Sequence, residues 1–246
     1  MMSATTWDFS AQRVLVTGAS SGIGWEVVQQ LLVAGASVYA MGRDPAALAI
    51  LADQGCHVLA VEMADSVALS DALAGLPVVH GLVNCAGISL LEAASEVSAA
   101  AFDQVMAVNV RAAALVAASV ARRMIAEGVA GSIVNVSSQA SLVALDDHLS
   151  YCASKGAMDA MTRVQCAEWG KHGIRVNAVN PTVTLTPMAA MAWSEPSKRD
   201  PALAAIPLGR FAQTREIAAP ILFLLSEAAS MISGVALPID GGYTSR

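Results

Sequence analysis

Tyr151 and Lys155 are the side chains whose types and spacing most directly suggest chemistry in this sequence. They lie four residues apart within SYCASKGAMDAM, residues 150–161, whose small residues are typical of a closely packed helix. This spacing places a phenol and an ammonium group one turn apart on the same helix face. A free phenol has a pKa near 10, and a cation within about 4–6 Å lowers it because it favours the phenolate. The pair could therefore exchange protons with a bound molecule, although an ordinary helix-surface contact has the same spacing.

A glycine-rich turn, TGASSGIG, occupies residues 17–24 and contains Gly18, Gly22 and Gly24. It follows the β-branched run RVLVT and precedes a helical pattern that reaches about residue 34. Glycines at these positions permit a tight turn, close approach of the backbone to a pyrophosphate and tight helix–strand packing. The helix directs its amide groups and its positive dipole end at the phosphates. The turn therefore predicts a dinucleotide site; the alternative is a glycine-rich loop that binds nothing.

The end of the second expected strand indicates which dinucleotide would bind. An NAD site usually carries an acid there, about 20 residues past the glycines, to hold the ribose 2′-hydroxyl. Here the residues are Met41, Gly42 and Arg43, and a guanidinium can pair with a 2′-phosphate and lie on the adenine face. We therefore expect NADP(H), with NAD(H) still open because Asp44 follows immediately. Arg43 could also be a solvated surface residue.

Short apolar strands alternate with helical stretches along the chain and would position these groups. Apolar strands separated by helices indicate βαβ units and a parallel sheet covered on both faces. No linker, internal repeat or low-complexity block divides the chain, so we expect residues 1–246 to form a single domain. The expected strands are residues 13–17, 37–41, 57–61, 82–84, 132–136, 174–179 and 235–239.

The least regular segment, residues 181–209, contains five prolines. A long segment of this kind near the carboxyl edge of a sheet is often a lid over a ligand, which we place at about residues 183–209. Met188, Met191 and Trp193 occur there with few charges, which favours a neutral substrate. The alternative is a meandering surface connection.

Composition and charge exclude several classes of protein. The net charge of −6, without a dense basic run, disfavours nucleic-acid binding. We find no apolar stretch of about 18 residues and no signal pattern, and therefore expect no membrane insertion. The four cysteines lack metal-binding spacing, so we expect no metal and reduced thiols in the cytoplasm. Hydrophobic residues make up 55% and charged residues 14%, which predicts that part of the surface is buried against other subunits.

Five motifs together resemble the short-chain dehydrogenase/reductase family across essentially the whole chain. Within residues 131–246, GSIVNVSSQAS, IRVNAVNPTV and IPLGRFA are most similar to the dicarbonyl/L-xylulose reductases of that family. The resemblance implies a single-domain Rossmann-type α/β fold, a doubly wound parallel sheet of about seven strands, and a homotetramer. The five motifs are TGASSGIG, NCAG (residues 84–87), Asn109, Ser138 in NVSS, and YCASK (residues 151–155).

The family likeness implies a catalytic role for four residues. Tyr151 would give a proton to a carbonyl or take one from an alcohol, and Lys155 would also hold the nicotinamide ribose hydroxyls. Ser138 would hydrogen-bond the substrate oxygen and stabilise the charge that develops there. Asn109 would hold a water that links Lys155 to solvent. Taken alone, Ser138 could be a helix or turn cap, and Asn109 could cap or kink a helix.

The likeness also implies contacts with substrate and cofactor. Residues that correspond to His148 and Trp193 lie at the substrate site of the dicarbonyl/L-xylulose reductases, so these two join Ser138 and Tyr151 as expected substrate contacts. His148 could instead be an exposed loop histidine. The expected cofactor contacts are Gly18, Ser20, Ser21, Gly22, Ile23, Gly24, Arg43, Glu62, Met63, Asn84, Ala86, Gly87, Tyr151, Lys155, Pro181, Val183 and Thr186.

Several departures from the family pattern leave details open. Cys85 replaces an amide of the common NNAG motif, which changes the local hydrogen-bonding groups. Ser21 stands where many NADP-dependent members have a basic residue, which leaves Arg43 as the only obvious 2′-phosphate anchor. Glu62 stands where aspartate is usual near the adenine, and Pro181–Thr182 replaces the frequent Pro–Gly.

The sequence thus predicts an NADP(H)-dependent oxidoreductase that interconverts a ketone or dicarbonyl and an alcohol, such as a small sugar or polyol. One alternative is an NAD-preferring polyol or cyclic alcohol dehydrogenase. A more distant one is a dinucleotide-binding regulator without activity, although such a protein would be free to lose Ser138, Tyr151 or Lys155, and all three are present.

Overall fold

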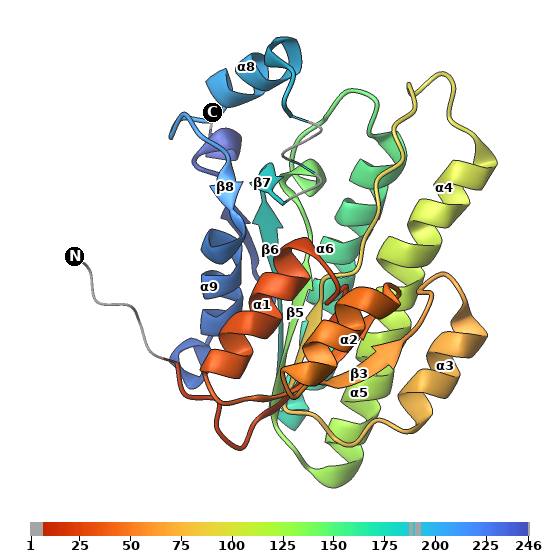
Figure 1. The fold of residues 1–246 in the computed structure, drawn as a ribbon, viewed down its shortest axis with the longest axis vertical. Helices are drawn as coiled ribbons and strands as arrows, with labels where there is room; N and C mark the ends of the chain where they lie inside the picture. Colours follow the sequence, from red (N-terminus) through yellow and green to blue (C-terminus); the bar gives the residue numbers. More distant parts are fainter. Residues whose placement is uncertain (1–6, 187–188, 190–192, 246) are drawn as a thin grey trace.

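The computed structural model describes residues 7–186, 189 and 193–245. Its centre is a seven-stranded sheet in the order β3-β2-β1-β4-β5-β6-β9, with every neighbouring pair parallel (Figure 1). This order is that of a doubly wound dinucleotide-binding sheet. The strands are β1 (Arg13–Thr17), β2 (Ser37–Gly42), β3 (His57–Ala60), β4 (Gly81–Asn84), β5 (Gly131–Val136), β6 (Ile174–Pro181) and β9 (Ala236–Ile239).

Helices cover both faces of the sheet. Successive side chains of a strand point to opposite faces, so Val14 and Val16 of β1 join one buried cluster and Leu15 joins the other. The first cluster lies under α1 (Gly22–Val33), α2 (Pro45–Asp53) and α9 (Thr214–Leu225). The second lies under α3 (Ser66–Ala74), α5 (Ala113–Glu127) and the end of α6 (Leu149–Trp169).

The carboxyl ends of the strands meet at one edge of the sheet. Thr17 is in register with both Met41 and Asn84, and Val136 is in register with Val179. This edge therefore gathers the segments that follow β1, β2, β4, β5 and β6. Beyond it lie β7 (Thr184–Leu185), β8 (Ala212–Gln213) and α8 (Pro196–Ala204), at the top of Figure 1.

The α/β fold and its seven expected strands are confirmed, with boundaries that differ by at most two residues. The short parallel pair β7–β8 was not predicted, because two residues per strand show no periodicity. Pro181 is the last residue of β6 and is in register with Ile239 of the edge strand β9. The segment expected to form a lid contains α8, none of whose residues is buried.

One continuous helical stretch, Ala99–Glu127, combines α4 (Ala99–Met106), a π-helical segment η1 (Ala107–Ala112) and α5. By length and composition alone it could cross a membrane, which corrects our prediction that the sequence has no apolar stretch of about 18 residues. Within its most apolar window 56% of the residues are buried in the fold. Val116, Val120 and Met124 belong to the second core cluster, so the stretch is apolar because it packs against the sheet.

Candidate active site

Tyr151 and Lys155 lie on the first turns of α6, as the spacing predicts. Tyr151 is half-buried and Lys155 is buried. The Lys155 Nζ lies 5.6 Å from the centre of the Tyr151 ring and donates a 2.7 Å hydrogen bond to the carbonyl oxygen of Val136, the last residue of β5. The lysine is therefore anchored to the edge of the sheet.

Ser138 follows β5 and its side chain serves two purposes. Its hydroxyl accepts a 3.1 Å hydrogen bond from the backbone N–H of Ala140 and so caps the short 3-10 helix η2 (Gln139–Ser141). The same hydroxyl is hydrogen-bonded to the Tyr151 side chain. The turn cap and the expected contact with tyrosine are thus both present, and Ser138 and Tyr151 converge on one point.

Burial dominates the electrostatics of the pair. Burial raises the pKa of Tyr151 above its usual value, and the hydrogen bond from Ser138 opposes this only in part. Burial also lowers the pKa of Lys155 to about 8. We expected the ammonium to lower the pKa of Tyr151, but the pKa is raised in the protein alone. Removing the phenolate from water destabilises it more than the neighbouring groups stabilise it.

Asn109 lies within the π-helical segment η1 and is fully buried. Its Oδ1 accepts a 2.8 Å hydrogen bond from the N–H of Ile88, and its Nδ2 donates to the Ile88 carbonyl and to Ser154 Oγ, both at 2.9 Å. Both amide hydrogens are thus used. The side chain therefore joins the segment after β4 to α6. The water predicted at Asn109 would have to bind its Oδ1 or its main chain.

The glycine-rich turn has the shape of a phosphate cradle. Gly18 has φ +65°, and a Cβ there would lie 2.8 Å from Ala86 Cα. A Cβ on Gly24 would lie 2.3 Å from the Gly18 carbonyl oxygen, and one on Gly22 would lie 2.9 Å from Thr186 Cγ2. Ser21 precedes α1 and its side chain does not cap the helix, so the N-terminal end of α1 can receive a phosphate. The residues present fit a dinucleotide pyrophosphate.

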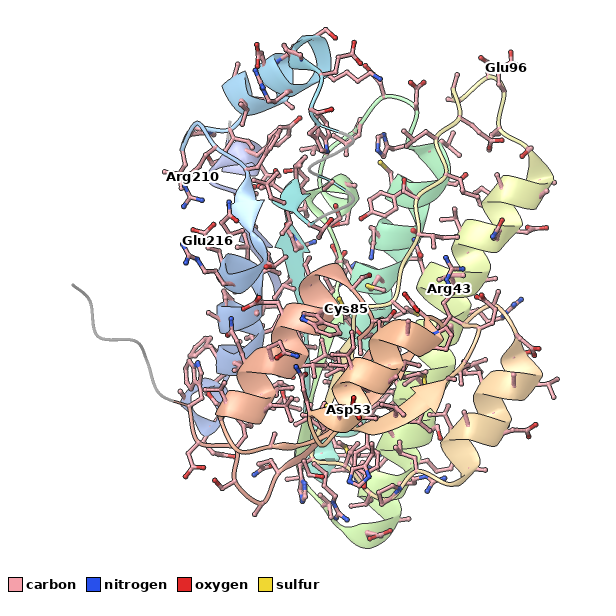
Figure 2. All side chains as sticks on the ribbon, in the orientation of Figure 1. Arg43, Asp53, Cys85, Glu96, Arg210 and Glu216 are labelled. Carbon is pink, nitrogen blue, oxygen red and sulfur yellow. The ribbon has the colours of Figure 1, made fainter. Side chains whose placement is uncertain are left out.

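The NCAG segment lies beside this turn. Thr17 Oγ1 accepts hydrogen bonds from the backbone N–H groups of Cys85 and Ala86, each at 3.1 Å. Asn84 points into the core, where its Nδ2 donates to Asn135 Oδ1 at 2.9 Å. Cys85 and Arg43 both lie at the carboxyl edge of the sheet (Figure 2). Burial raises the pKa of the Cys85 thiol to about 11.

Arg43, the expected 2′-phosphate anchor, is exposed and forms a 3.3 Å ion pair with Glu62. Asp44, which left NAD(H) open, instead caps α2 by accepting from the N–H groups of Ala46 and Ala47. Met63, an expected adenine neighbour, is 8% exposed and packs in the second core cluster.

His148 and Trp193 have different surroundings. The His148 ring lies edge-on to Tyr151, with ring centres 6.1 Å apart, and its Nδ1 contacts the Asp146 carbonyl at 2.5 Å. Trp193 packs against Phe211, with ring centres 5.4 Å apart. Met188 and Met191 lie outside the described residues. A cleft of about 600 Å³ beside His148 is lined by Ala94, Ala144, Leu145, Asp146, Asp147, Leu149 and Cys152.

The chain after β6 borders the same edge. The Val183 carbonyl accepts a 3.0 Å hydrogen bond from the N–H of Ala212, which ties this segment to β8. Thr186 Oγ1 accepts from the N–H of Ala189 at 3.1 Å, and Thr186 faces Gly22 across the glycine-rich turn. Pro181, Val183 and Thr186 therefore follow one another past the phosphate cradle.

Two buried polar residues at the site were not predicted. Asp159 and Asn180 are bonded to one another, and Asn180 is bonded to Ser138. The signal for Asp159 is present, because it follows Lys155 by the same four residues that separate Lys155 from Tyr151. Asn180 comes from another element, and nothing in the local pattern joins it to α6. Among the described residues, no group of three His, Cys, Asp or Glu side chains could hold a metal.

Sequence comparisons show which known proteins this chain is similar to. Residues 18–244 match the family model described as enoyl-(acyl carrier protein) reductase. The chain is 47% identical to L-xylulose reductase of Bos taurus over 236 residues, which is 95% of this chain and 97% of that protein. It is 43% identical to D-erythrulose reductase of Gallus gallus (96% of each chain). It is 41% identical to D-threitol dehydrogenase of Mycolicibacterium smegmatis (94% of this chain and 92% of that protein).

Solved structures agree with the sequence relatives. A short-chain dehydrogenase/reductase family protein superposes with a TM-score of 0.91 at 34% identity, over 97% of this chain and all of that chain. A structure described as an NAD(P)-dependent gluconate 5-dehydrogenase of Beutenbergia cavernae, with bound NADP at low occupancy, has a TM-score of 0.92 at 32% identity, over 98% of this chain and all of that one. The chain therefore belongs to the short-chain dehydrogenase/reductase family of oxidoreductases.

Proposed function

We propose that the protein is an NADP(H)-dependent reductase that interconverts a ketone or dicarbonyl and the corresponding alcohol, with small sugars and polyols as substrates. One observation carries the proposal: the hydrogen-bonded pair Ser138–Tyr151, backed by the anchored Lys155, at the edge that holds the glycine-rich turn. Relatives named for L-xylulose, D-erythrulose and D-threitol support the sugar or polyol substrate.

The proposed roles follow from the chemistry of each group. A bound nicotinamide dinucleotide would supply or accept the hydride. Tyr151 donates its proton to the carbonyl oxygen during reduction and takes one from the alcohol during oxidation. Ser138 hydrogen-bonds the same oxygen and stabilises its developing charge. Lys155 holds the ribose hydroxyls and supplies positive charge behind the phenol.

The preference for NADP(H) is proposed from the end of β2. Arg43 is exposed, and Asp44 is engaged at the start of α2. Asp44, the acid that could hold a ribose 2′-hydroxyl, is thus engaged in capping the helix, while the guanidinium of Arg43 is available to a 2′-phosphate. The relative with bound NADP supports this. Glu62, Met63, Asn84, Ala86 and Gly87 are proposed to line the adenosine, and Pro181, Val183 and Thr186 the nicotinamide.

One observation favours an NAD-preferring polyol dehydrogenase as the second candidate. Glu62 is paired with Arg43 and places a carboxylate where a 2′-phosphate would come, which disfavours NADP(H) by charge repulsion. The balance between the two cofactors then depends on how easily the phosphate displaces Glu62 from Arg43. Because both side chains are exposed, we place this cost below about 1 kcal/mol.

Three further features are proposed with this function. Residues 183–209 act as a lid, with His148 and Trp193 as substrate contacts. The chain forms a homotetramer, a proposal supported by exposed Leu115 and Ile125 on α5 and exposed Val164 on α6. The compartment is the cytoplasm, and no nucleic acid is bound.

The test is a substrate screen with both cofactors. Purified protein is mixed with L-xylulose, D-erythrulose, D-threitol and a small dicarbonyl, each with NADPH or NADH for reduction, or NADP⁺ or NAD⁺ for oxidation. We expect turnover with at least one sugar or polyol and a higher kcat/KM with NADP(H). Sustained inactivity across this panel would refute the function, and a strong preference for NAD(H) would favour the second candidate.

A further inference from the structure

A buried acid lies directly behind the catalytic residues. Asp159 follows Lys155 by one turn of α6 and is 5% exposed. Its Oδ2 accepts a 3.0 Å hydrogen bond from Nδ2 of Asn180, and its Oδ1 has no hydrogen-bond partner in the described part of the chain. A buried carboxylate with one neutral partner costs free energy, so stability does not explain why it is there.

Asn180, near the end of β6, links this acid to the catalytic serine. Its Nδ2 donates to the Ser138 carbonyl oxygen at 3.1 Å and lies 2.7 Å from Ser141 Oγ. A carbonyl can only accept, so this contact determines which way the amide of Asn180 points. The main chain of Ser138 is therefore held by the same nitrogen that bonds Asp159. Its hydroxyl, which faces Tyr151, depends on that main-chain position.

Asp159 is also the charged neighbour of Lys155. Burial lowers the pKa of Lys155, and Cys85 and Asp159 oppose that effect. The pKa of the Cys85 thiol is itself raised to about 11, so the thiol carries no charge at neutral pH. Tyr151 has a raised pKa and is also neutral there. Asp159 is therefore left as the acidic neighbour whose charge favours the protonated form of Lys155.

We propose that Asp159 is a positioning residue for the catalytic group: through Asn180 it holds Ser138, and from behind Lys155 it keeps the ammonium charged. Tyr151, Lys155 and Asp159 follow one another at intervals of four residues, so one face of α6 carries the proton donor, the cation and the counter-charge. This inference rests on the proposed reductase function.

The test replaces Asp159 with Asn, which keeps the shape but offers Asn180 a neutral acceptor, and so a weaker hydrogen bond, in place of a carboxylate. We expect kcat to fall on the order of tenfold or more because Ser138 is held less firmly. The alkaline limb of kcat/KM for the dinucleotide should also move to lower pH, because Lys155 loses its proton earlier. The unfolding temperature should not fall, because the buried carboxylate itself costs free energy, and the dinucleotide Kd at pH 6.5, where Lys155 is protonated, should stay at the wild-type value.

Two further variants make the outcome decisive. Gln165→Met is the matched control: Gln165 is buried on the same helix, about 9 Å beyond Asp159, and its Oε1 has no hydrogen-bond partner among the described residues. This variant should change neither kcat nor the pH profile. If Asp159→Asn does not fold, Asn180→Ala replaces it, with loss of kcat expected at unchanged dinucleotide Kd.

Wild-type kcat and pH profile in Asp159→Asn would overturn the inference. So would a loss of activity that comes with a lowered unfolding temperature and an unmoved alkaline limb, since a purely structural residue behaves in that way. Inactivity of the wild-type protein on the whole substrate panel would instead refute the function on which the inference rests.

Discussion

Lys155 lies 5.6 Å from the centre of the Tyr151 ring, while its ammonium donates a 2.7 Å hydrogen bond to the carbonyl oxygen of Val136. The cation is thus fixed to the end of β5, behind the phenol and out of bulk water. Burial, rather than mutual attraction, dominates the pKa values of both groups: it raises that of Tyr151 and lowers that of Lys155. The buried charge of Lys155 therefore destabilises the folded protein, and this effect can be measured.

The first prediction concerns stability. The pKa of Lys155 falls from 10.5 to about 8 on folding, a value that already includes the attraction of Asp159. Between pH 8 and pH 10.5 the unfolded chain binds a proton that the folded chain does not. The contribution of Lys155 to the free energy of unfolding therefore becomes more favourable as pH rises from 8 to 10.5. Below pH 8 the folded state is destabilised by the full cost of burying the protonated lysine, about 3 kcal/mol.

Lys155→Met should therefore raise the unfolding temperature at pH 7, with a net gain of about 2 kcal/mol after the hydrogen bond to Val136 is lost. The gain should nearly vanish at pH 10, where the wild-type lysine is already neutral. Thermal unfolding of both proteins at the two pH values checks this. A lower unfolding temperature for the variant at pH 7 would show that burial of the ammonium is not costly.

The second prediction concerns the choice of cofactor. Arg43→Ala should raise KM for NADP(H) about tenfold or more, since a hydrogen-bonded charge pair is lost, and should change KM for NAD(H) little. Glu62→Gln should act in the opposite direction and lower KM for NADP(H) a few-fold, because it frees Arg43 from its ion pair.

Steady-state kinetics at constant ionic strength measures both effects. Lys171→Ala, which removes an exposed positive charge elsewhere, controls for the change in net charge. If Arg43→Ala leaves the ratio of the two KM values unchanged, Arg43 is a solvated surface residue and the preference for NADP(H) has another origin.

The third prediction concerns the segment that joins the proposed lid to α9. Glu216 and Arg210 face each other at the start of that helix (Figure 2), and Glu216 also accepts from the N–H of Gln213. The hydrogen bond from Arg210 lowers the pKa of Glu216 to about 2. Its stabilising contribution is present above pH 4.5, the usual value, and is lost as pH falls toward 2.

Glu216→Gln should lower stability by about 1 kcal/mol at pH 7, a modest amount because the pair is partly exposed. The difference from wild type should shrink as pH falls below 4.5. Urea unfolding midpoints at pH 7 and pH 3 measure it. Glu195→Gln, in the exposed Glu195–Lys198 pair, should leave the midpoint unchanged. Equal effects of the two variants would show that the contacts of Glu216 with Arg210 and Gln213 add no stability.

The sheet and the groups at its edge could be read from the sequence because local pattern determines them. The run RVLVT is β1 to the residue, and the glycine turn, NCAG and the Tyr151 helix fall where their motifs predict. The β7–β8 pair and the π-helical turn at Asn109 could not be read, since neither has a local periodicity of its own. Both depend on packing between distant segments.

Contacts between elements account for what was missed at the site. Arg43 and Glu62 were each singled out, yet their ion pair depends on β2 and β3 lying side by side. Asp159 and Asn180 meet because α6 packs against β6, and they are 21 residues apart in the chain. The sign of the Tyr151 pKa shift could not be foreseen either, because it depends on burial, which spacing does not reveal.

The most direct test of the central claim is Tyr151→Phe, assayed with a saturating sugar or polyol substrate under single-turnover conditions. The variant keeps the ring and removes only the hydroxyl that Ser138 contacts. We predict that hydride transfer slows by at least about 100-fold, whereas the Kd for the dinucleotide changes less than about twofold. Full activity in Tyr151→Phe would contradict the account, since the proton would then come from another group.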